Sequence, residues 1–169
     1  MGPQAVAPPG DHKILLLTRG VMSASLEIES LTRLPFFQEL NPDELKHLAA
    51  FFFEKSYSQN ATLFVEGMEG GILYVIKSGA VQILKRLANN QEALLATLRE
   101  GAFLGEMSLV ENQPRSATAR VVEGSTLLAM TKGSFDTMMR KHPGVALKIL
   151  LAFLKITNDR LDKANAPRA

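Results

Sequence analysis

Short apolar runs closed by turn residues fill the middle of the chain. Between residues 55 and 131, segments rich in branched and aromatic side chains alternate with glycine and asparagine turns. Several short segments at this spacing are typical of antiparallel strands in a sandwich or barrel. We expect strands at residues 62–66, 72–77, 80–86, 92–98, 118–122 and 126–131.

Helical patterns flank this β region on both sides. We expect helices at residues 25–33, 42–53, 132–141 and 144–163. Asn41 is a suitable N-cap for the second of these, and Pro42 suits the first helical position. His142-Pro143 separates the last two, because a proline disfavours helical backbone in the residue before it. The order of elements predicts a mainly β fold, an antiparallel β-roll with flanking helices.

The length and composition fit one globular domain with a short extension. Of the 169 residues, 46% are hydrophobic and 21% are charged, which is enough apolar material for a packed core. Residues 1–24 contain scattered prolines and lack the order of a signal peptide, so we predict a flexible leader there. The domain is expected to span 25–169, with the roll at about 55–131 and the C-terminal helices at about 132–163.

Charge, cysteine content and hydropathy narrow the functional classes. The net charge of +2 is too small to indicate nucleic acid binding by itself. The chain contains no cysteine, which excludes disulfides and thiolate chemistry. Its apolar runs fall far short of the roughly 20 residues that a membrane span needs. We therefore expect a cytoplasmic protein without a membrane segment.

One segment, residues 101–118, carries polar groups that a plain β-roll does not need. Gly105 has no side chain, so a ligand can approach its backbone, and the amides that follow it can begin a helical turn that binds an anion. Arg115 can donate two hydrogen bonds to phosphate oxygens, and Ser116 adds a hydroxyl. Glu106 can accept a hydrogen bond from a sugar hydroxyl. Donors for a phosphate and an acceptor for a ribose on one loop indicate a cyclic nucleotide.

At these residues the chain resembles the cyclic-nucleotide-binding domain family. That family includes the bacterial catabolite activator protein, the regulatory subunits of protein kinase A and cyclic-nucleotide-gated channels. Its phosphate-binding cassette has the pattern F-G-E-x-A-L followed by P-R-x-A. This chain has L-G-E-M-S-L at residues 104–109 and P-R-S-A at residues 114–117. Leu104 and Ser108 depart from the pattern, but neither departure removes a charged group.

The resemblance extends over about residues 30–163. Residues 64–67 and 74–81 look like the family's strand-and-glycine pattern, although Met68 stands where the family often has an acidic residue. By resemblance, the roll would be of the jelly-roll type, a double-stranded β-helix. The last helix would fold over the ligand pocket as a lid.

The resemblance also implies a set of ligand contacts. Gly105 and Glu106 would bind the ribose 2′-hydroxyl, and Arg115 would pair with the cyclic phosphate. The ligand would be cAMP or cGMP, because Ser116 could reach either the phosphate or a guanine amino group; the likeness to bacterial members favours cAMP. No metal or cofactor is expected. The predicted ligand-binding set is Gly105, Glu106, Met107, Ser108, Arg115, Ser116, Ala117, Ile83, Leu95 and Arg160.

The last predicted helix carries two stripes. One consists of Ile149, Phe153, Ile156 and Arg160, and the other of Leu147, Leu150, Leu154, Thr157 and Leu161. We expect the first stripe to face the roll, so that Arg160 reaches the base; a solvated arginine near the helix end is the alternative. The second stripe has the spacing of a short heptad seam, which could serve a homodimer, a separate effector protein or intramolecular packing.

Other functional classes find less support. A transcription factor would need a helix-turn-helix after the long helix, where only residues 164–169 remain, so no direct DNA binding is expected. A cupin-type metalloenzyme needs histidine and carboxylate ligands on strands, and no predicted strand carries a histidine. No nucleophile–base pair marks a catalytic site, so we expect no enzyme. The alternative is a family member that lost its ligand and acts as a protein-interaction scaffold, and Glu106 and Arg115 argue against it because both polar anchors are present. A separate reading of these two residues is an ordinary ion pair on the loop.

Overall fold

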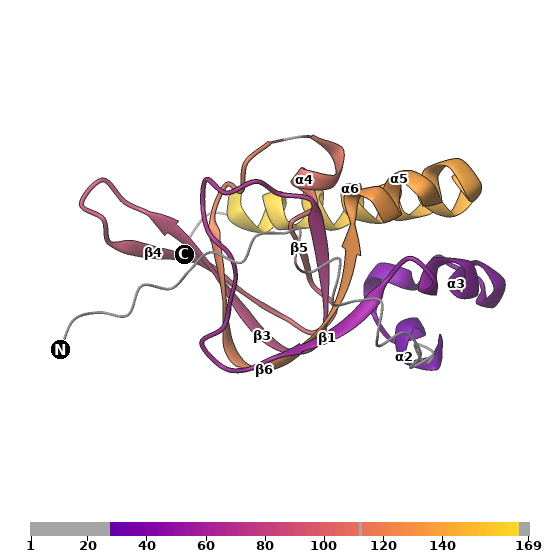
Figure 1. The fold of residues 1–169 in the computed structure, drawn as a ribbon, viewed down its shortest axis with the longest axis horizontal. Helices are drawn as coiled ribbons and strands as arrows, with labels where there is room; N and C mark the ends of the chain where they lie inside the picture. The colour runs from indigo at the N-terminus through magenta and orange to yellow at the C-terminus, as the bar shows by residue number, and fades with distance from the viewer. Residues whose placement is uncertain (1–27, 112, 166–169) are drawn as a thin grey trace.

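A computed structural model describes residues 28–111 and 113–165, which form an antiparallel sheet flanked by helices (Figure 1). The elements are α2 (Ile28–Thr32), η1 (Pro35–Phe37), α3 (Pro42–Ala49), β1 (Phe53–Tyr57), β2 (Thr62–Phe64), β3 (Ile72–Arg86), β4 (Glu92–Arg99), β5 (Phe103–Leu104), α4 (Met107–Val110), β6 (Thr118–Thr131), α5 (Lys132–Lys141) and α6 (Pro143–Asn165). The predicted β-roll with flanking helices is confirmed. The predicted leader, 1–24, lies outside the described residues.

The sheet is organised around its two longest strands, β3 and β6. These pair with each other, and the order across the sheet is β1-β6-β3-β4, with β2 also on β6 and β5 also on β3. All of these pairings are antiparallel. In Figure 1, α6 runs alongside the roll, α2 and α3 lie at one end of it, and the hairpin of β3 and β4 projects at the other.

Two predicted turns proved to be bends inside continuous strands. The segments 72–77 and 80–86 form one strand, β3, and 118–122 and 126–131 form another, β6. Gly79 has a φ of 91°, and the register of β3 against β6 shifts around it, so the chain bulges there without ending the strand. The Ser125 hydroxyl accepts a hydrogen bond from the Ala80 amide at 3.1 Å and replaces ladder bonding at the bend.

The second predicted helix is shorter than expected. Asn41 caps α3 as predicted, because its side chain accepts from the Glu44 amide at 2.9 Å and the Glu44 carboxylate accepts from the Asn41 amide. However, α3 ends at Ala49, and Phe53 begins the strand β1, which the sequence pattern did not predict. Pairing with β6, seen at Phe53 and Ala129, overrides the local helical preference here.

A cluster of phenylalanines joins the helices to the roll. The buried ring of Phe36 lies 5.3 Å from that of Phe103 and 5.1 Å from that of Phe153, centroid to centroid. Phe103 belongs to this helical core, whereas the next residue, Leu104, belongs to the core inside the roll. Successive strand residues point to opposite faces, so β5 contacts both cores at once. This fixes α6 against the strand that leads into the cassette segment.

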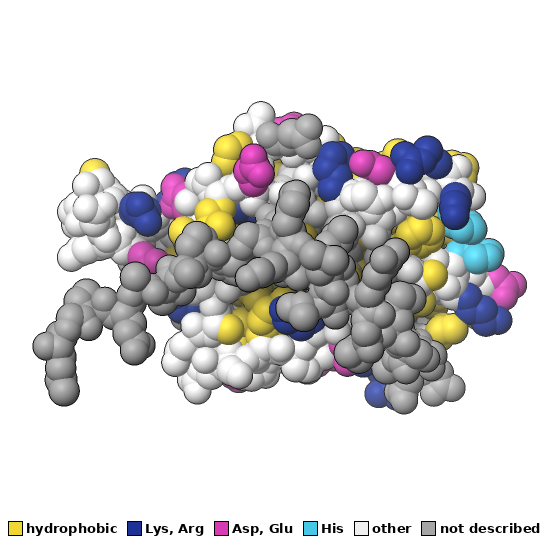
Figure 2. All heavy atoms as spheres, viewed as in Figure 1, with side chains coloured by type: hydrophobic (Ala, Val, Ile, Leu, Met, Phe, Trp, Pro, Cys, Tyr) yellow, Lys and Arg dark blue, Asp and Glu magenta, His cyan; other side chains and the backbone are white. Residues whose placement is uncertain are grey.

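A second contact holds the N-terminal helices against the junction of α5 and α6. The rings of His47 and His142 stack with centroids 4.5 Å apart. Figure 2 shows histidine side chains in cyan at one end of the molecule, next to Lys and Arg side chains. Nearby, Lys148 of α6 donates to the carboxylate of Glu44 in α3 at 2.8 Å. The two contacts connect α3 to both C-terminal helices.

Candidate functional site

The cassette segment makes a sharp turn between β5 and α4. Gly105 has a φ of 84°, a backbone conformation that residues with a Cβ rarely adopt. A Cβ on Gly105 would lie 2.5 Å from Nη1 of Arg115 and 2.6 Å from the carbonyl oxygen of Ile72. The short helix predicted after Gly105 is present as α4. The absence of a side chain at Gly105 therefore lets the Arg115 guanidinium lie against the turn.

The Arg115 side chain is buried and held by several groups at once. Its Nη1 donates to the Ser108 hydroxyl at 3.1 Å and to the Gly105 carbonyl at 3.4 Å, and its Nη2 donates to the Ile72 carbonyl at 2.9 Å. The ring of Phe64 lies below, 4.1 Å from Cζ. Sequence reasoning gave Phe64 no role, although it lies in the segment 64–67 that resembles the family.

The loop that carries Arg115 is clamped to the segment after β2. The Arg115 amide donates to the Met68 carbonyl, and the Gly67 amide donates to the Arg115 carbonyl, both at 2.8 Å. Lys85 donates to the Glu66 carboxylate and to the Ser116 carbonyl, each at 2.7 Å. The Lys85 ammonium, followed by the Arg86 amide, lowers the pKa of the Glu66 carboxyl. These bonds fix the backbone on both sides of Arg115.

A cavity of about 150 Å³ opens between the cassette, the roll and α6. Its lining includes all of the predicted ligand-binding residues except Leu95. The structure thus brings together predicted residues that are distant in the chain, such as Ile83 of β3, Arg115 of the cassette and Arg160 of α6. The remaining lining residues, which the predicted set did not include, are Phe64, Leu98, Leu104 and Pro114.

Leu95, the remaining member of the predicted set, lies outside this lining. The pairing of β3 with β4 goes from Ile83 opposite Ala96 to Leu84 opposite Leu94, so Leu95 is the extra residue of a bulge. Its side chain is 59% exposed. Leu98, on the regular part of β4, lines the cavity instead.

Arg160 reaches the cavity from α6. It donates to the Phe103 carbonyl at 2.8 Å, and its Cζ lies 4.5 Å from the centroid of the Phe103 ring. Burial lowers the pKa of this arginine, and the Glu106 carboxylate opposes that shift. Arg160 is therefore partly buried against β5 and not fully solvated.

Comparison with known proteins places the chain in a family. Residues 54–142 match the family described as "Cyclic nucleotide-binding domain". The chain belongs to this family. The match begins at Glu54, the second residue of β1, and ends at His142, directly after α5. It therefore includes nearly the whole roll and the cassette.

Individual known proteins are similar to most of this chain. The "Cyclic AMP receptor protein" of Thermus thermophilus is 37% identical over 120 residues, which are 70% of this chain and 56% of that protein. The chain thus spans little more than half the length of this relative. The N-terminal domain of a transcriptional regulator from Streptomyces coelicolor A3(2) is 32% identical, with a TM-score of 0.67 over 78% of this chain and 94% of that one.

A further solved structure supports the fold alone. A cyclic nucleotide-binding domain from Methylobacillus flagellatus KT has a TM-score of 0.77 and covers 83% of this chain and 81% of that one, at 22% sequence identity. At this identity the likeness carries no information on the ligand.

The structure confirms that the first predicted stripe of α6 faces the core, and it corrects the membership of the second stripe. Ile149 and Phe153 are buried in the helical core, and Ile156 packs against it, as expected. On the outer side, Leu150 also packs against the core, so it does not belong to the exposed seam. The exposed leucines are Leu147, Leu151, Leu154 and Leu161, each 55–58% exposed.

Neither a metal site nor a membrane helix occurs in the part of the chain that the structure describes. Within residues 28–111 and 113–165, no three histidine, cysteine or carboxylate side chains are grouped so that they could hold a metal ion. None of the helices in the same ranges has the length and hydropathy that crossing a bilayer requires.

Proposed function

We propose that this domain is a regulatory sensor of a cyclic nucleotide, with cAMP as the favoured ligand. The observation that carries the proposal is the buried guanidinium of Arg115, held in the cavity wall beside Gly105 and Ser108. A cation fixed in advance and shielded from water binds a phosphate without the cost of ordering the side chain. Glu106, in the same lining, would accept a hydrogen bond from the ribose 2′-hydroxyl.

The remaining lining would hold the base and the sugar ring. Ile83 and Leu98 offer apolar contacts from the roll, and Arg160 offers a cation from α6. Because Arg160 already donates to Phe103, a base that recruits it would change the contact between α6 and β5. The ligand would then shift the equilibrium between two positions of α6. The size of this shift is set by the difference between the ligand's affinities for the two positions.

Two observations bear on the choice between cAMP and cGMP. The Thermus thermophilus relative is named a cyclic AMP receptor protein, which favours cAMP. The Ser116 side chain is exposed at the rim of the cavity, where it could also reach a guanine amino group. We therefore propose cAMP first and keep cGMP as the second ligand to test.

The output of the domain would pass through α6 to a protein partner in the cytoplasm. The exposed leucines of α6 offer a surface for a second copy of the chain or for a separate effector protein. The described residues, 28–111 and 113–165, include no helix-turn-helix, and we expect no direct DNA binding by this chain. The expected role is binding and signalling, without catalysis.

Calorimetry with cAMP and with cGMP tests the proposal. The parent chain should bind cAMP, and Arg115→Gln should lose about 2–5 kcal/mol of binding free energy, because the phosphate loses its cationic partner. Glu106→Gln should weaken binding less, since one neutral acceptor remains. Arg99→Gln, which removes an exposed cation paired with Glu123 away from the cavity, should bind like the parent.

The same measurement identifies the scaffold alternative. If neither nucleotide produces heat or a thermal shift at millimolar concentration, the domain does not sense these ligands and a scaffold role is favoured. Equal affinity of the parent and the Arg115→Gln variant, with circular dichroism showing both folded, would place the phosphate elsewhere and refute the assigned site.

A further inference from the structure

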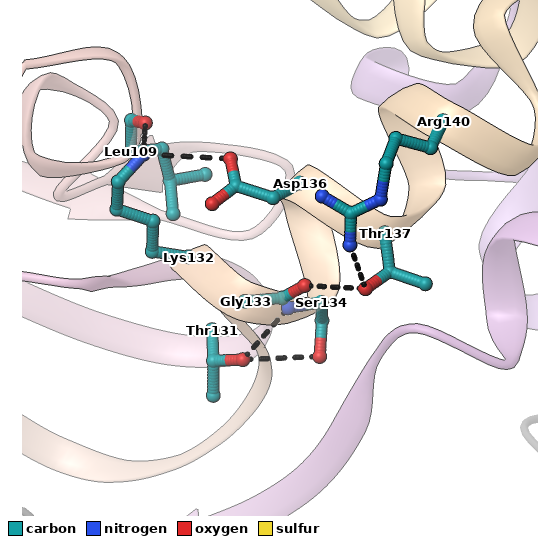
Figure 3. Close-up of polar contacts among 8 residues, drawn as sticks. All are labelled: Leu109, Thr131, Lys132, Gly133, Ser134, Asp136, Thr137 and Arg140. Carbon is teal, nitrogen blue, oxygen red and sulfur yellow. Dashed lines mark hydrogen bonds and ion pairs between the residues drawn. The ribbon is translucent and has the colours of Figure 1, made fainter.

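A polar cluster at the start of α5 connects this helix to the cassette (Figure 3). Thr131, the last residue of β6, caps α5 by accepting a hydrogen bond from the Ser134 amide at 3.1 Å. The next residue, Lys132, donates through its backbone amide to the Gly71 carbonyl at 2.7 Å. The first turn of α5 is therefore fixed to the end of β6 and to the segment that begins β3.

The side chain of Lys132 extends from this fixed point to α4. Its Nζ donates to the Leu109 carbonyl at 3.1 Å and lies 3.4 Å from the Asp136 carboxylate. The Leu109 carbonyl is in the last turn of α4, where helix carbonyls have no partner in the helix and attract cations. Asp136 holds the ammonium from the α5 side, so that Lys132 bridges the two helices.

Apolar packing brings the same two helices together. The Leu109 side chain is 1% exposed and belongs to the core cluster that contains Phe135 and Met138 of α5. The hydrogen bonds from the Leu109 amide to Glu106 and from the Glu111 amide to Met107 keep α4 a single short unit. A displacement at the Glu106 end of α4 therefore moves the Leu109 carbonyl as well.

Backbone bonds carry such a displacement onward to α6. His142, between α5 and α6, donates its amide to the Met138 carbonyl at 2.7 Å, and its own carbonyl accepts from the Ala146 amide at 3.0 Å. The two helices are thus joined through one residue with hydrogen bonds on both sides. A change at the start of α5 can reach α6 without a flexible linker.

We propose that Lys132 is a positioning residue that couples the cassette helix α4 to α5 and α6. It holds the Leu109 end of α4, while the ligand is proposed to bind at the Gly105 end. This inference rests on the proposed function for the ligand itself. The ammonium group transmits a shift of α4 to the first turn of α5, and its removal deletes the polar tie between the two helices while the apolar packing of Leu109 remains.

A spin-label distance experiment tests the coupling. The chain has no cysteine, so a double variant takes spin labels at the two introduced cysteines and nowhere else. These are Gln59→Cys, in the turn after β1, and Lys155→Cys, on the exposed side of α6. In the parent, cAMP should change the distance between the labels. Lys132→Met keeps the aliphatic length of the side chain and removes its charge. This variant should still bind cAMP in calorimetry, but cAMP should change its label distance by less than about half of the change in the parent.

Matched variants and a ligand-free measurement separate coupling from general damage. Lys132→Arg restores the cation and should restore the distance change. Arg140→Met removes a cation of the same helix whose side chain donates to the Thr137 hydroxyl of α5 at 3.2 Å (Figure 3), and should behave like the parent. Without ligand, hydrogen exchange of the Leu109 and Glu111 amides should be faster in Lys132→Met than in Arg140→Met, because α4 has lost its tie.

The outcomes distinguish the two proposals. If the parent binds cAMP and moves α6, but Lys132→Met moves it equally, the coupling role of Lys132 is refuted and the sensor function stands. If exchange in α4 is the same in Lys132→Met and Arg140→Met, the positioning role is refuted as well. If the parent binds no cyclic nucleotide, the sensor function fails and the coupling fails with it.

Discussion

At the scale of single residues, Gly105 determines whether the arginine of the cassette can reach its place. Its φ of 84° is available to glycine at little cost, and its missing side chain leaves room for the Arg115 guanidinium. The turn, the buried cation and the Ser108 hydroxyl therefore depend on one position. The sequence pattern L-G-E-M-S-L contains this requirement, but only the fold shows which atoms would collide.

We expect Gly105→Ala to impair both folding and binding. The new Cβ would meet Nη1 of Arg115 and the Ile72 carbonyl, so the backbone strain of about 1–3 kcal/mol should lower the thermal midpoint. Calorimetry should show cAMP affinity reduced at least about tenfold, because the phosphate-binding groups are displaced. Gly144→Ala, in open space on α6, is the matched control and should change neither quantity much. Parental affinity in Gly105→Ala would contradict this view of the turn.

At the scale of elements, α6 has one face in the core and one face without a partner in the described residues. The exposed leucines follow 4,3 spacing from Leu147 through Leu151 and Leu154, and continue to Leu161. Asn158 occupies the heptad position between the last two. In a two-stranded parallel coiled coil, an asparagine at an a position sets the register and the number of strands. The spacing therefore favours a second copy of the chain as the partner of this face.

The paired variant Leu151→Gln with Leu154→Gln tests this association. Sedimentation velocity of the parent should show a dimer that dissociates on dilution, and the variant should remain monomeric, because the seam loses two apolar knobs. Both leucines are more than half exposed, so the fold should survive their replacement. The control, Asp159→Gln with Lys163→Gln, changes exposed α6 residues outside the seam and should dimerise like the parent. A parent that is monomeric at every concentration would leave the effector protein as the partner.

At the scale of the whole molecule, ion pairs connect elements that are distant in the chain. Glu44 of α3 pairs with Lys148 of α6, and Glu92 of β4 forms two hydrogen bonds with Arg120 of β6, at 2.8 and 3.1 Å. In each case the cationic partner lowers the pKa of the carboxyl group. A carboxyl whose folded pKa is lowered adds stability above its unfolded pKa and loses it as the pH falls through the folded pKa.

We therefore expect the domain to be acid-sensitive. The thermal midpoint should be nearly constant from pH 7 to about 5.5 and should fall as the pH passes below the ordinary glutamate pKa of 4.5. Glu92→Gln should reduce the steepness of this fall, since one linked proton is removed. Glu100→Gln, which changes an exposed carboxylate in the turn before β5, should leave the slope close to that of the parent. A midpoint that rises on acidification would contradict the assigned sign.

The sequence by itself determined the features that depend on neighbouring residues. The Asn41 cap, the break at His142-Pro143 and the turn at Gly105 follow from local backbone preferences, which act over a few residues. The cassette pattern and the order of helices and strands could also be predicted from local sequence patterns. Together they were enough to indicate the family. Every predicted ligand residue that this local pattern supplied, from Gly105 to Ala117, lines one cavity.

Only the tertiary structure decided which distant residues meet. The bulge that displaces Leu95, the ring of Phe64 beneath Arg115 and the bond from Lys132 to Leu109 each join segments that share no local pattern. The continuity of β3 and β6 through their bends likewise depends on pairing between strands. Register, bulges and long-range contacts follow from packing the whole chain at once, whereas turn and capping preferences act within a few residues.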